Sequence, residues 1–368
     1  MNGAGDGESG ARGSQDRAAM TTTASPAGAG PVIGGLDGGG TKTECVIYDP
    51  ATGRLGWARS GPLNTNYISA DEAARNALSA LTDAAATAGS HVSCLRRLVV
   101  AAPWSEALVA EVARQAAPGS AVEAAGEDRA ALMGGWLRPS GLVLTAGTGS
   151  RCAWIPDTGT EPPIVTGAWG SLFGDEGSGY DIGCRALRAA ARHWDGRGPA
   201  TALGALIEGA WQLEQPKAVV RFVYGPPPGG WRGRIAALCP LVGRAAADGD
   251  QSALDILDQA AAGLAEMVAA TARLAGLRQP YRLLTAGGVF GLGQLLLAPL
   301  RGHLATLGAA EILRPELTAA YGALLLAATK FAGPPPDAGL VAACRRHYSK
   351  RQRGCGPGIM YNGPSKEA

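Results

Sequence analysis

The sequence repeats one short plan, in which two apolar segments flank a glycine-rich turn. Short apolar runs on either side of such a turn are typical of two strands joined as a hairpin. Two hairpins of the same kind predict two similar domains, because each hairpin opens its own stretch of alternating strands and helices. In chain order, the segments are Val32–Leu36, the turn Asp37–Thr43, Glu44–Tyr48, Leu142–Thr145, the turn Gly147–Ser150 and Cys152–Ile155.

Strand and helix patterns alternate around these hairpins, which favours an α/β fold. Ser69 and Glu72 have the spacing of a capping box before a helical pattern. Two similar domains of this class would face each other across a central cleft. The other expected elements are strands at Gly53–Ser60, Leu98–Ala102, Ala121–Ala124 and Leu283–Ala286, and helices from about Trp104, over Arg129–Leu137, through most of 178–274 and over Leu317–Phe331.

The length of 368 residues, with 46% hydrophobic residues, suits two domains because single cores stop growing near about 250–300 residues. We expect one domain over 31–139 and a second over 140–332. Residues 1–30 are rich in Gly, Ala, Ser and Thr, which predicts disorder. Residues 333–368 open with three prolines and continue into a basic, glycine-containing stretch, which predicts a flexible tail.

The balance of charge and the scattered cysteines exclude several classes of function. With 33 basic and 31 acidic residues, no global basic field implies a nucleic-acid partner. The chain shows neither a signal peptide nor an apolar run of the roughly 18 residues that a membrane helix needs. Seven cysteines without a CxxC motif argue against a zinc site or a disulfide framework. We therefore expect a cytoplasmic protein that binds no nucleic acid and no membrane.

The first turn has the residues of a phosphate-binding loop. Gly38, Gly39 and Gly40 lack a Cβ, so their backbone N–H groups can approach phosphate oxygens closely. Thr41 adds a hydroxyl and Lys42 a charge. The turn precedes a strand, so it is neither a Walker A loop nor a dinucleotide fingerprint, since both of those open a helix.

Three further features are candidates for nucleotide, metal and catalytic chemistry. Asp37 offers the oxygen ligand that Mg²⁺ prefers. The second turn, which contains Gly147, Thr148 and Gly149, could hold a polyphosphate from the side opposite the first turn. The pair Glu127-Asp128 begins a helix, where a carboxylate is ordinary in itself. The dipeptide Gly287-Gly288 follows a strand, where a purine could lie flat on exposed backbone.

The stretch from Gly167 to Asp181 combines glycines and acids just before a helical pattern. A helix start presents free N–H groups, and Asp175 and Glu176 can accept hydrogen bonds from sugar hydroxyls. An acidic first turn that complements the helix dipole is the simpler alternative. It explains one acid but not five glycines, so we favour a binding site.

Taken in order, these motifs resemble the phosphate-1, phosphate-2 and adenosine motifs of the actin/hexokinase-like superfamily. The run GAWGSLFGDEGSGYDIG is similar to the GGWG and GDEGS signature of the BadF/BadG/BcrA/BcrD-type ATPases, which include N-acetylglucosamine kinases. The resemblance covers about 32–332. It implies two actin-like, ribonuclease H-like domains, ATP and Mg²⁺ as cofactors, and a homodimer as a possible assembly.

The resemblance also implies roles for individual residues. Asp128 takes the place of the catalytic aspartate, and Asp37 that of the acid near magnesium. Asn64 matches the asparagine that contacts the sugar, with Asn66 as the rival. The remaining roles are ATP-phosphate contacts at Thr41 and Thr148, an adenosine turn at Gly287 and Gly288, and sugar contacts at Ser150, Trp169, Gly170 and Asp175.

The implied reaction is phosphorylation of an amino sugar at its 6-hydroxyl, with N-acetylglucosamine first and glucosamine or another sugar as alternatives. Three departures leave the identity of the sugar open: Glu127 before Asp128, Arg151 after the second turn, and Ala168 in place of a glycine. The alternative from another class is an ATP-hydrolysing activator of 2-hydroxyacyl-CoA dehydratases. That activator needs cysteine ligands for an iron–sulfur cluster between two subunits.

Overall fold

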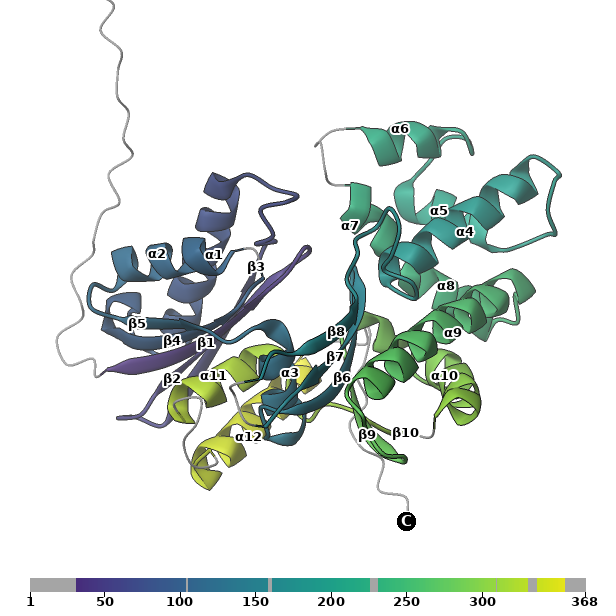
Figure 1. Cartoon of the computed structure of the whole chain (residues 1–368). Helices are drawn as coiled ribbons and strands as arrows, with labels where there is room; N and C mark the ends of the chain where they lie inside the picture. Colours follow the sequence, from purple (N-terminus) through teal and green to yellow (C-terminus); the bar gives the residue numbers. More distant parts are fainter. Residues whose placement is uncertain are drawn as a thin grey trace, which may run out of the picture.

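The computed structural model has two lobes, each built on one β-sheet with helices packed against it (Figure 1). It describes residues 31–103, 105–157, 161–225, 231–308, 310–329 and 336–354. The segment 1–30 and the end of the chain after 354 lie outside the described residues. The expectation of disorder for 1–30 therefore stays a prediction.

The first sheet has the strand order β3-β2-β1-β4-β5. The expected hairpin is confirmed, because β1 and β2 pair antiparallel with Asp37 opposite Glu44. On the other side β1 pairs with β4 in parallel. The elements of this region are β1 (Val32–Gly38), β2 (Thr43–Asp49), β3 (Arg54–Ser60), α1 (Ala70–Thr87), the short 3₁₀ turn Val92–Cys94, β4 (Leu95–Ala101), α2 (Glu106–Ala116), β5 (Ala121–Ala124) and α3 (Glu127–Trp136).

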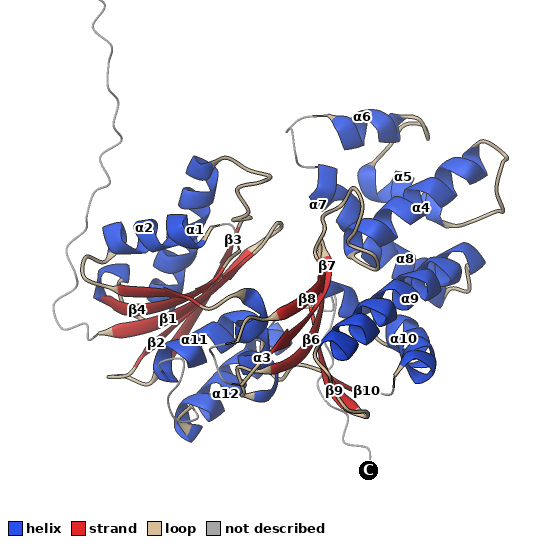
Figure 2. Cartoon of the chain, in the orientation of Figure 1, coloured by secondary structure: helices blue, strands red, loops and turns tan. Residues whose placement is uncertain are grey.

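The second sheet repeats the plan of the first, which confirms the duplication seen in the sequence. Its order is β10-β9-β6-β7-β8, so an antiparallel hairpin again extends into parallel strands. Figure 2 shows the two sheets with helices around each of them. The strands are β6 (Gly141–Ala146), β7 (Ser150–Ile155), β8 (Ile164–Gly167), β9 (Tyr281–Ala286) and β10 (Ala310–Leu313).

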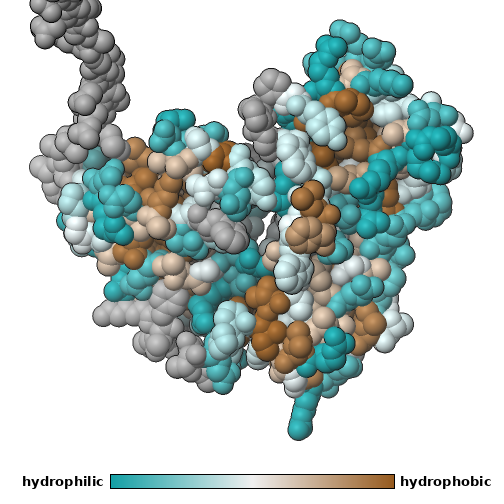
Figure 3. Space-filling model, turned by 45° about the horizontal axis from the view of Figure 1, so that its top comes forward, coloured by the Kyte–Doolittle hydropathy of each residue, from teal (hydrophilic) through white to brown (hydrophobic). Residues whose placement is uncertain are grey.

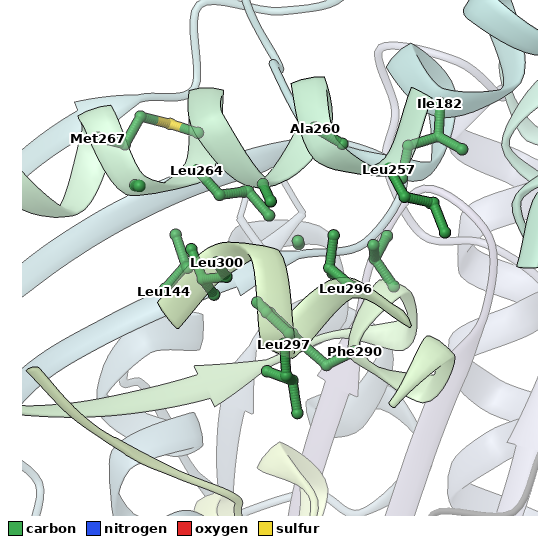
Figure 4. Packing of buried hydrophobic residues seen from close by; sticks show 14 of the residues in the cluster. Leu144, Ile182, Leu257, Ala260, Leu264, Met267, Phe290, Leu296, Leu297 and Leu300 are labelled. Atoms are coloured by element: carbon green, nitrogen blue, oxygen red, sulfur yellow. The ribbon is translucent and has the colours of Figure 1, made fainter. Parts of the chain in front are cut away.

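Helices α4 to α9 between β8 and β9, together with α10 after β9, form most of the second lobe. The longest of them, α9, packs against α10 through an apolar contact that includes Leu257, Leu264, Leu296 and Leu300 (Figure 4). Burying side chains of this size stabilises the lobe by about 1.5–3 kcal/mol each. The helices are α4 (Gly179–Trp194), α5 (Leu203–Trp211), α6 (Ala218–Tyr224), α7 (Trp231–Ala236), α8 (Cys239–Ala247), α9 (Gln251–Leu274), the 3₁₀ turn Gly288–Leu292 and α10 (Gln294–Leu307).

Helix α11 (Ala319–Thr329) lies on the first sheet, although the expected boundaries put its residues in the second domain. A Cβ on Gly35 of β1 would lie 2.0 Å from the backbone nitrogen of Leu324. A Cβ on Gly322 would lie 1.9 Å from the carbonyl oxygen of Ala130 in α3. Glycine at both positions lets α11 pack directly against β1 and α3. A domain boundary at residue 140 therefore does not match the packing, because α11 follows that residue in sequence but belongs to the first lobe.

The expectation of a flexible tail is wrong for residues 338–354, which form helix α12 (Ala338–Gly354). Leu340, Val341 and Cys344 are buried in the same cluster as Leu324 of α11. The basic residues that suggested a tail lie in the second half of this helix, whereas its buried apolar residues lie in the first half. The prolines before the helix and the residues after it lie outside the described part of the chain, except Pro336.

Candidate active site

The two lobes enclose a cleft of about 1780 Å³. Its walls come from both hairpin turns, from the loop after β3 and from the segment that precedes α4. Figure 3 shows the hollow between the two lobes. Almost all the residues that the sequence predicts as site residues line this one cleft. The exceptions are Gly38, which is buried beside Leu63, and Asp128.

The two predicted phosphate turns meet across the cleft. The side-chain oxygen of Thr41 lies 2.8 Å from that of Thr148. Each turn is closed by its own backbone hydrogen bond, from the Gly39 N–H to the Lys42 carbonyl at 3.0 Å and from the Gly147 N–H to the Gly149 carbonyl at 2.8 Å. The sequence predicted two turns acting from opposite sides, and their hydroxyls converge on one point.

The ammonium of Lys42 is bound to a carboxylate rather than directed freely into the cleft. Its Nζ lies 3.0 Å from the Glu44 carboxylate, which Arg59 also contacts at 2.7 Å. Burial acts to raise the pKa of Glu44, but the two cations outweigh burial and lower it. Lys42 and Arg59 both line the cleft, so this ion cluster places positive charge near the first turn.

Asp37 lies at the end of β1, where its carboxyl group faces the cleft. The pKa of Asp37 is raised to about 7, chiefly by burial and then by the nearby Glu127 and Glu44 carboxylates, while Lys42 and Arg151 act to lower it. A buried carboxyl surrounded by other acids has too little positive charge around it. A divalent cation with oxygen ligands would supply that charge, so the residues present fit Mg²⁺.

Gly287 and Gly288 lie at the end of β9 and line the cleft beside the second turn. Gly287 has φ of +103°, and a Cβ there would lie 2.2 Å from the carbonyl oxygen of Ala146. Only glycine allows this close approach of β9 to the end of β6. Gly287 and Gly288 are both exposed, so their backbone is accessible from the cleft.

Asp128 is nearly buried at the start of α3 and is held by Arg151 of β7. The Arg151 guanidinium donates to one carboxylate oxygen of Asp128 from Nε at 3.1 Å and lies 2.9 Å from it through a second nitrogen. The same guanidinium pairs with Glu127. Glu127 and Arg151 line the cleft directly, whereas Asp128 does not. Burial raises the pKa of Glu127, and Arg151 only partly offsets this.

Asp175 is 3% exposed and lies in the left-handed region with φ of +61°. Its carboxylate accepts a hydrogen bond from the Ser150 N–H at 3.2 Å, which links the segment before α4 to the second turn. Burial raises the pKa of Asp175, while the Ser150 N–H and the Arg232 guanidinium act in the opposite direction. Ser150 is buried and its hydroxyl donates to the Glu176 carbonyl at 2.7 Å.

The other predicted sugar contacts lie around the mouth of the cleft. Asn64 and Asn66 both line it, and the Asn64 side chain accepts from the Asn66 N–H at 2.9 Å. Their positions alone do not select one of the two. Trp169 is 71% exposed and Gly170 follows it in the left-handed region.

Arg232 and Tyr67 are cleft residues that sequence reasoning missed. Arg232 comes from the short helix α7 and is 7% exposed. Its guanidinium lies 2.5 Å from the Asp175 carboxylate and donates to the Tyr67 hydroxyl. No motif surrounds either residue. The only signal was an arginine within the largely apolar helical region after residue 178, where a buried cation needs a partner.

Within the described parts of the chain, no helix combines the length and apolarity required to cross a membrane. No group of three or more His, Cys, Asp or Glu side chains forms a metal cluster among those residues either.

Like-folded lobes that each contribute a glycine-rich turn to one cleft define a two-lobed, nucleotide-binding protein. The chain belongs to the BadF/BadG/BcrA/BcrD ATPase family, whose family model matches residues 35–327. Family membership implies that the protein uses ATP.

Two curated relatives and two solved structures resemble the chain over most of its length. An N-acetylmuramic acid/N-acetylglucosamine kinase from Clostridium acetobutylicum is 27% identical over 300 residues, which cover 80% of this chain and 97% of the relative. An N-acetyl-D-glucosamine kinase from Dictyostelium discoideum is 28% identical over 280 residues, covering 69% and 84%.

Among solved structures, a candidate N-acetylglucosamine kinase from Chromobacterium violaceum matches with a TM-score of 0.63 and 25% identity. The match covers 81% of this chain and 99% of that structure. A ROK-family glucokinase from Streptomyces griseus, in complex with glucose and AMPPNP, has a TM-score of 0.52 at 17% identity and covers 86% and 99%. That second likeness supports the two-domain fold.

Proposed function

We propose that this protein is an ATP-dependent amino-sugar kinase that phosphorylates the 6-hydroxyl, with N-acetylglucosamine as the best candidate. The observation that carries the proposal is the contact between Thr41 and Thr148, in the same cleft as Asp175 and the Arg151 that holds Asp128. Two turns that can bind phosphate, together with the buried carboxylate of Asp128 near the proposed sugar site, suit transfer of a phosphoryl group to a sugar hydroxyl. Both curated relatives are kinases that act on N-acetylated amino sugars by name.

Phosphoryl transfer depends mainly on positioning and on stabilising negative charge. In this scheme the N–H groups and hydroxyls of the two turns hold the ATP phosphates. Asp37 would hold Mg²⁺, which when bound supplies positive charge to the phosphate oxygens. Asp128 accepts the proton of the 6-hydroxyl as that oxygen bonds to the γ-phosphorus, and ADP leaves.

Arg151 has a defined place in this scheme. It fixes the direction of the Asp128 carboxylate through two nitrogens. Since Glu127 shares the guanidinium, Asp128 does not neutralise the arginine alone. When both acids are ionised, the three side chains together carry one net negative charge beside the hydroxyl that must lose a proton.

The sugar itself belongs to the proposal. N-acetylglucosamine is common to the names of both curated relatives, and one of them also names N-acetylmuramic acid. Glucosamine and other sugars are the alternatives. We also propose that the enzyme is cytoplasmic. We propose in addition that it forms a homodimer, and gel filtration coupled to light scattering can test this by measuring the mass in solution.

The decisive experiment measures ATP consumption against a panel of amino sugars, with the mass of each product. N-acetylglucosamine should raise Mg²⁺-dependent ATP turnover and gain 80 mass units, the mass of one transferred PO₃H group. The matched control is 6-deoxy-N-acetylglucosamine, which lacks only the acceptor and should inhibit without being phosphorylated. If no sugar raises turnover above background, the kinase assignment fails.

The same preparation tests the alternative of a dehydratase activator. Cys152 is buried in β7 and Cys184 is partly exposed on α4. An activator would be brown and contain iron when it is purified without oxygen. A colourless and iron-free preparation with sugar-dependent turnover supports the kinase.

A further inference from the structure

Arg232 occupies a position that no phosphate or sugar motif explains. It is one of the few buried charged residues of the second lobe and lies on α7, a helix of only six residues. Its guanidinium packs over the ring of Tyr67 at 4.8 Å and near the ring of Tyr180 at 5.7 Å. Two aromatic faces and a carboxylate thus fix the plane of the guanidinium.

On one side Arg232 holds the carboxylate proposed for sugar binding. Its nitrogen lies 2.5 Å from one oxygen of Asp175, and the other oxygen accepts from the Ser150 N–H. Without this cation, Asp175 would be a buried carboxylate with a single backbone donor. Because burial already raises the pKa of Asp175, losing Arg232 would favour the protonated acid further.

On its other side Arg232 reaches the opposite lobe. It donates to the hydroxyl of Tyr67, which lies in the loop between β3 and α1. That loop also carries Asn64, whose carbonyl accepts from the Tyr67 N–H at 3.0 Å. The Asn64 N–H in turn reaches the Gly39 carbonyl of the first turn. One side chain therefore connects both halves of the candidate sugar site.

We propose that Arg232 is a positioning residue for the sugar, which orients Asp175 and ties it through Tyr67 to the loop that carries Asn64. The identity of the sugar rests on the proposed function, whereas the connection between the lobes does not. Arg232 sets the distance between the two sets of sugar contacts. The Arg232 guanidinium then affects both the affinity for the sugar and the distance between the two lobes.

The experiment compares Arg232→Met, Arg232→Lys and Tyr67→Phe, each purified as the full chain. Arg185→Met is the matched control, because Arg185 pairs with Asp181 in the same lobe at 3.0 Å without lining the cleft. Steady-state kinetics give the KM for N-acetylglucosamine and for ATP. Small-angle scattering gives the radius of gyration of each ligand-free protein.

We expect Arg232→Met to raise the sugar KM by about 10-fold or more while the ATP KM changes by less than about 3-fold. Arg232→Lys keeps the charge but lacks the two-pronged geometry, so it should restore only part of the sugar affinity. Tyr67→Phe removes one hydroxyl, and should raise the sugar KM by at least about 3-fold and enlarge the ligand-free radius of gyration. Arg185→Met should leave all three quantities at wild-type values.

A folded Arg232→Met protein with the wild-type sugar KM overturns the positioning role. If that variant does not fold, Tyr67→Phe decides, because wild-type values of its sugar KM and its radius of gyration overturn the connection between the lobes. Failure of the proposed function gives a different result, in which the wild-type protein itself phosphorylates no sugar. In that case the scattering of Tyr67→Phe and Arg232→Met still tests the connection, and unchanged radii overturn it.

Discussion

At the scale of single residues, the arrangement around Asp128 divides the roles of two neighbouring acids. Asp128 is bound by two nitrogens of one arginine, whereas Glu127 pairs with the same arginine from the cleft side. Glu127 and Arg151 both depart from the family pattern, and in the structure they contact each other. The positive charge of Arg151 beside the proposed base Asp128 is therefore offset by the second acid, Glu127.

This arrangement predicts unequal effects of two conservative substitutions. Asp128→Asn keeps size but cannot take the proton, so kcat should fall by at least about 10²-fold with a native fold and near-normal ATP affinity. Glu127→Gln keeps Arg151 on Asp128 and should cost much less. Steady-state kinetics of both proteins check this. A loss of kcat in Glu127→Gln alone would assign the base to the other carboxylate.

Asp37 predicts a pH dependence of stability in the metal-free protein. Its folded-state pKa of about 7 lies above the ordinary aspartate value of 3.8, so the folded state holds a proton that the unfolded chain releases. The resulting stabilisation is present below about pH 4 and is lost as pH rises through about 7. Urea unfolding should therefore show Asp37→Asn gaining stability over the wild type as pH increases from 5 to 8. A constant difference across that range would contradict the raised pKa.

Ala168 shows what one departure from the family pattern costs. It replaces a glycine of the family signature, and its φ of +60° lies in the region that favours glycine. A left-handed residue with a Cβ costs roughly 1–2 kcal/mol, part of which the flexibility of glycine in the unfolded chain cancels. Ala168→Gly should raise the free energy of unfolding by up to about 1 kcal/mol, measured by urea denaturation. A clear loss of stability would show that the alanine methyl group makes contacts that outweigh the strain.

At the scale of elements, α12 closes the apolar face of α11. The buried side chains of Leu340, Val341 and Cys344 join the cluster that lies against the first sheet. Further along the same helix, Arg351 lies 3.3 Å from the centre of the Trp57 ring of β3 and donates to the Tyr321 hydroxyl at 3.4 Å. The helix is therefore part of the first lobe, although it follows the whole second lobe in sequence.

Two truncations test this role of α12. A chain ending at residue 336 loses three buried side chains, and burial of each is worth about 1–3 kcal/mol, so its melting temperature should fall by several degrees or more. The control is a chain ending at residue 354, which keeps the helix and should melt at a higher temperature than the chain ending at residue 336. Equal melting temperatures for both truncations would show that α12 adds nothing to the stability of the lobe.

At the scale of the whole molecule, the cleft combines contributions from both lobes. Thr41 and Asp37 come from the first lobe, and Thr148 and Asp175 from the second. The proposed phosphate contacts and the proposed sugar contacts each come from both lobes, so neither subsite belongs to one lobe alone. Both ligands would therefore hold the lobes together.

This division can be measured with one substitution on each proposed subsite. Thr41→Val removes a hydroxyl at the meeting point of the turns and should chiefly raise the ATP KM. Asp175→Ala removes the sugar-site carboxylate and should chiefly raise the sugar KM. Steady-state kinetics with each substrate varied in turn give both values. If both variants raised only the sugar KM, the assignment of the turns to ATP would be wrong.

The sequence by itself determined the local elements of this protein. Both hairpins were predictable, since apolar runs and glycine turns depend on neighbouring residues alone. The Ser69 cap was also predictable, and the Glu72 N–H donates to its hydroxyl at 3.2 Å. The two turns that line the cleft could be recognised because a phosphate-binding turn is expected to contain several glycines close together, whose backbone N–H groups can approach phosphate oxygens. The four-residue strands β8 and β10 were missed, although β5, which has the same length, was predicted.

Only the tertiary structure decided which distant residues meet. The pairing of Arg151 with Glu127 and Asp128, and of Arg232 with Asp175 and Tyr67, joins side chains from separate elements. The docking of α11 and α12 on the first sheet joins segments from opposite ends of the chain. Such contacts are set by how whole elements pack around shared cores, and this information is spread over the sequence rather than held in any one stretch of it.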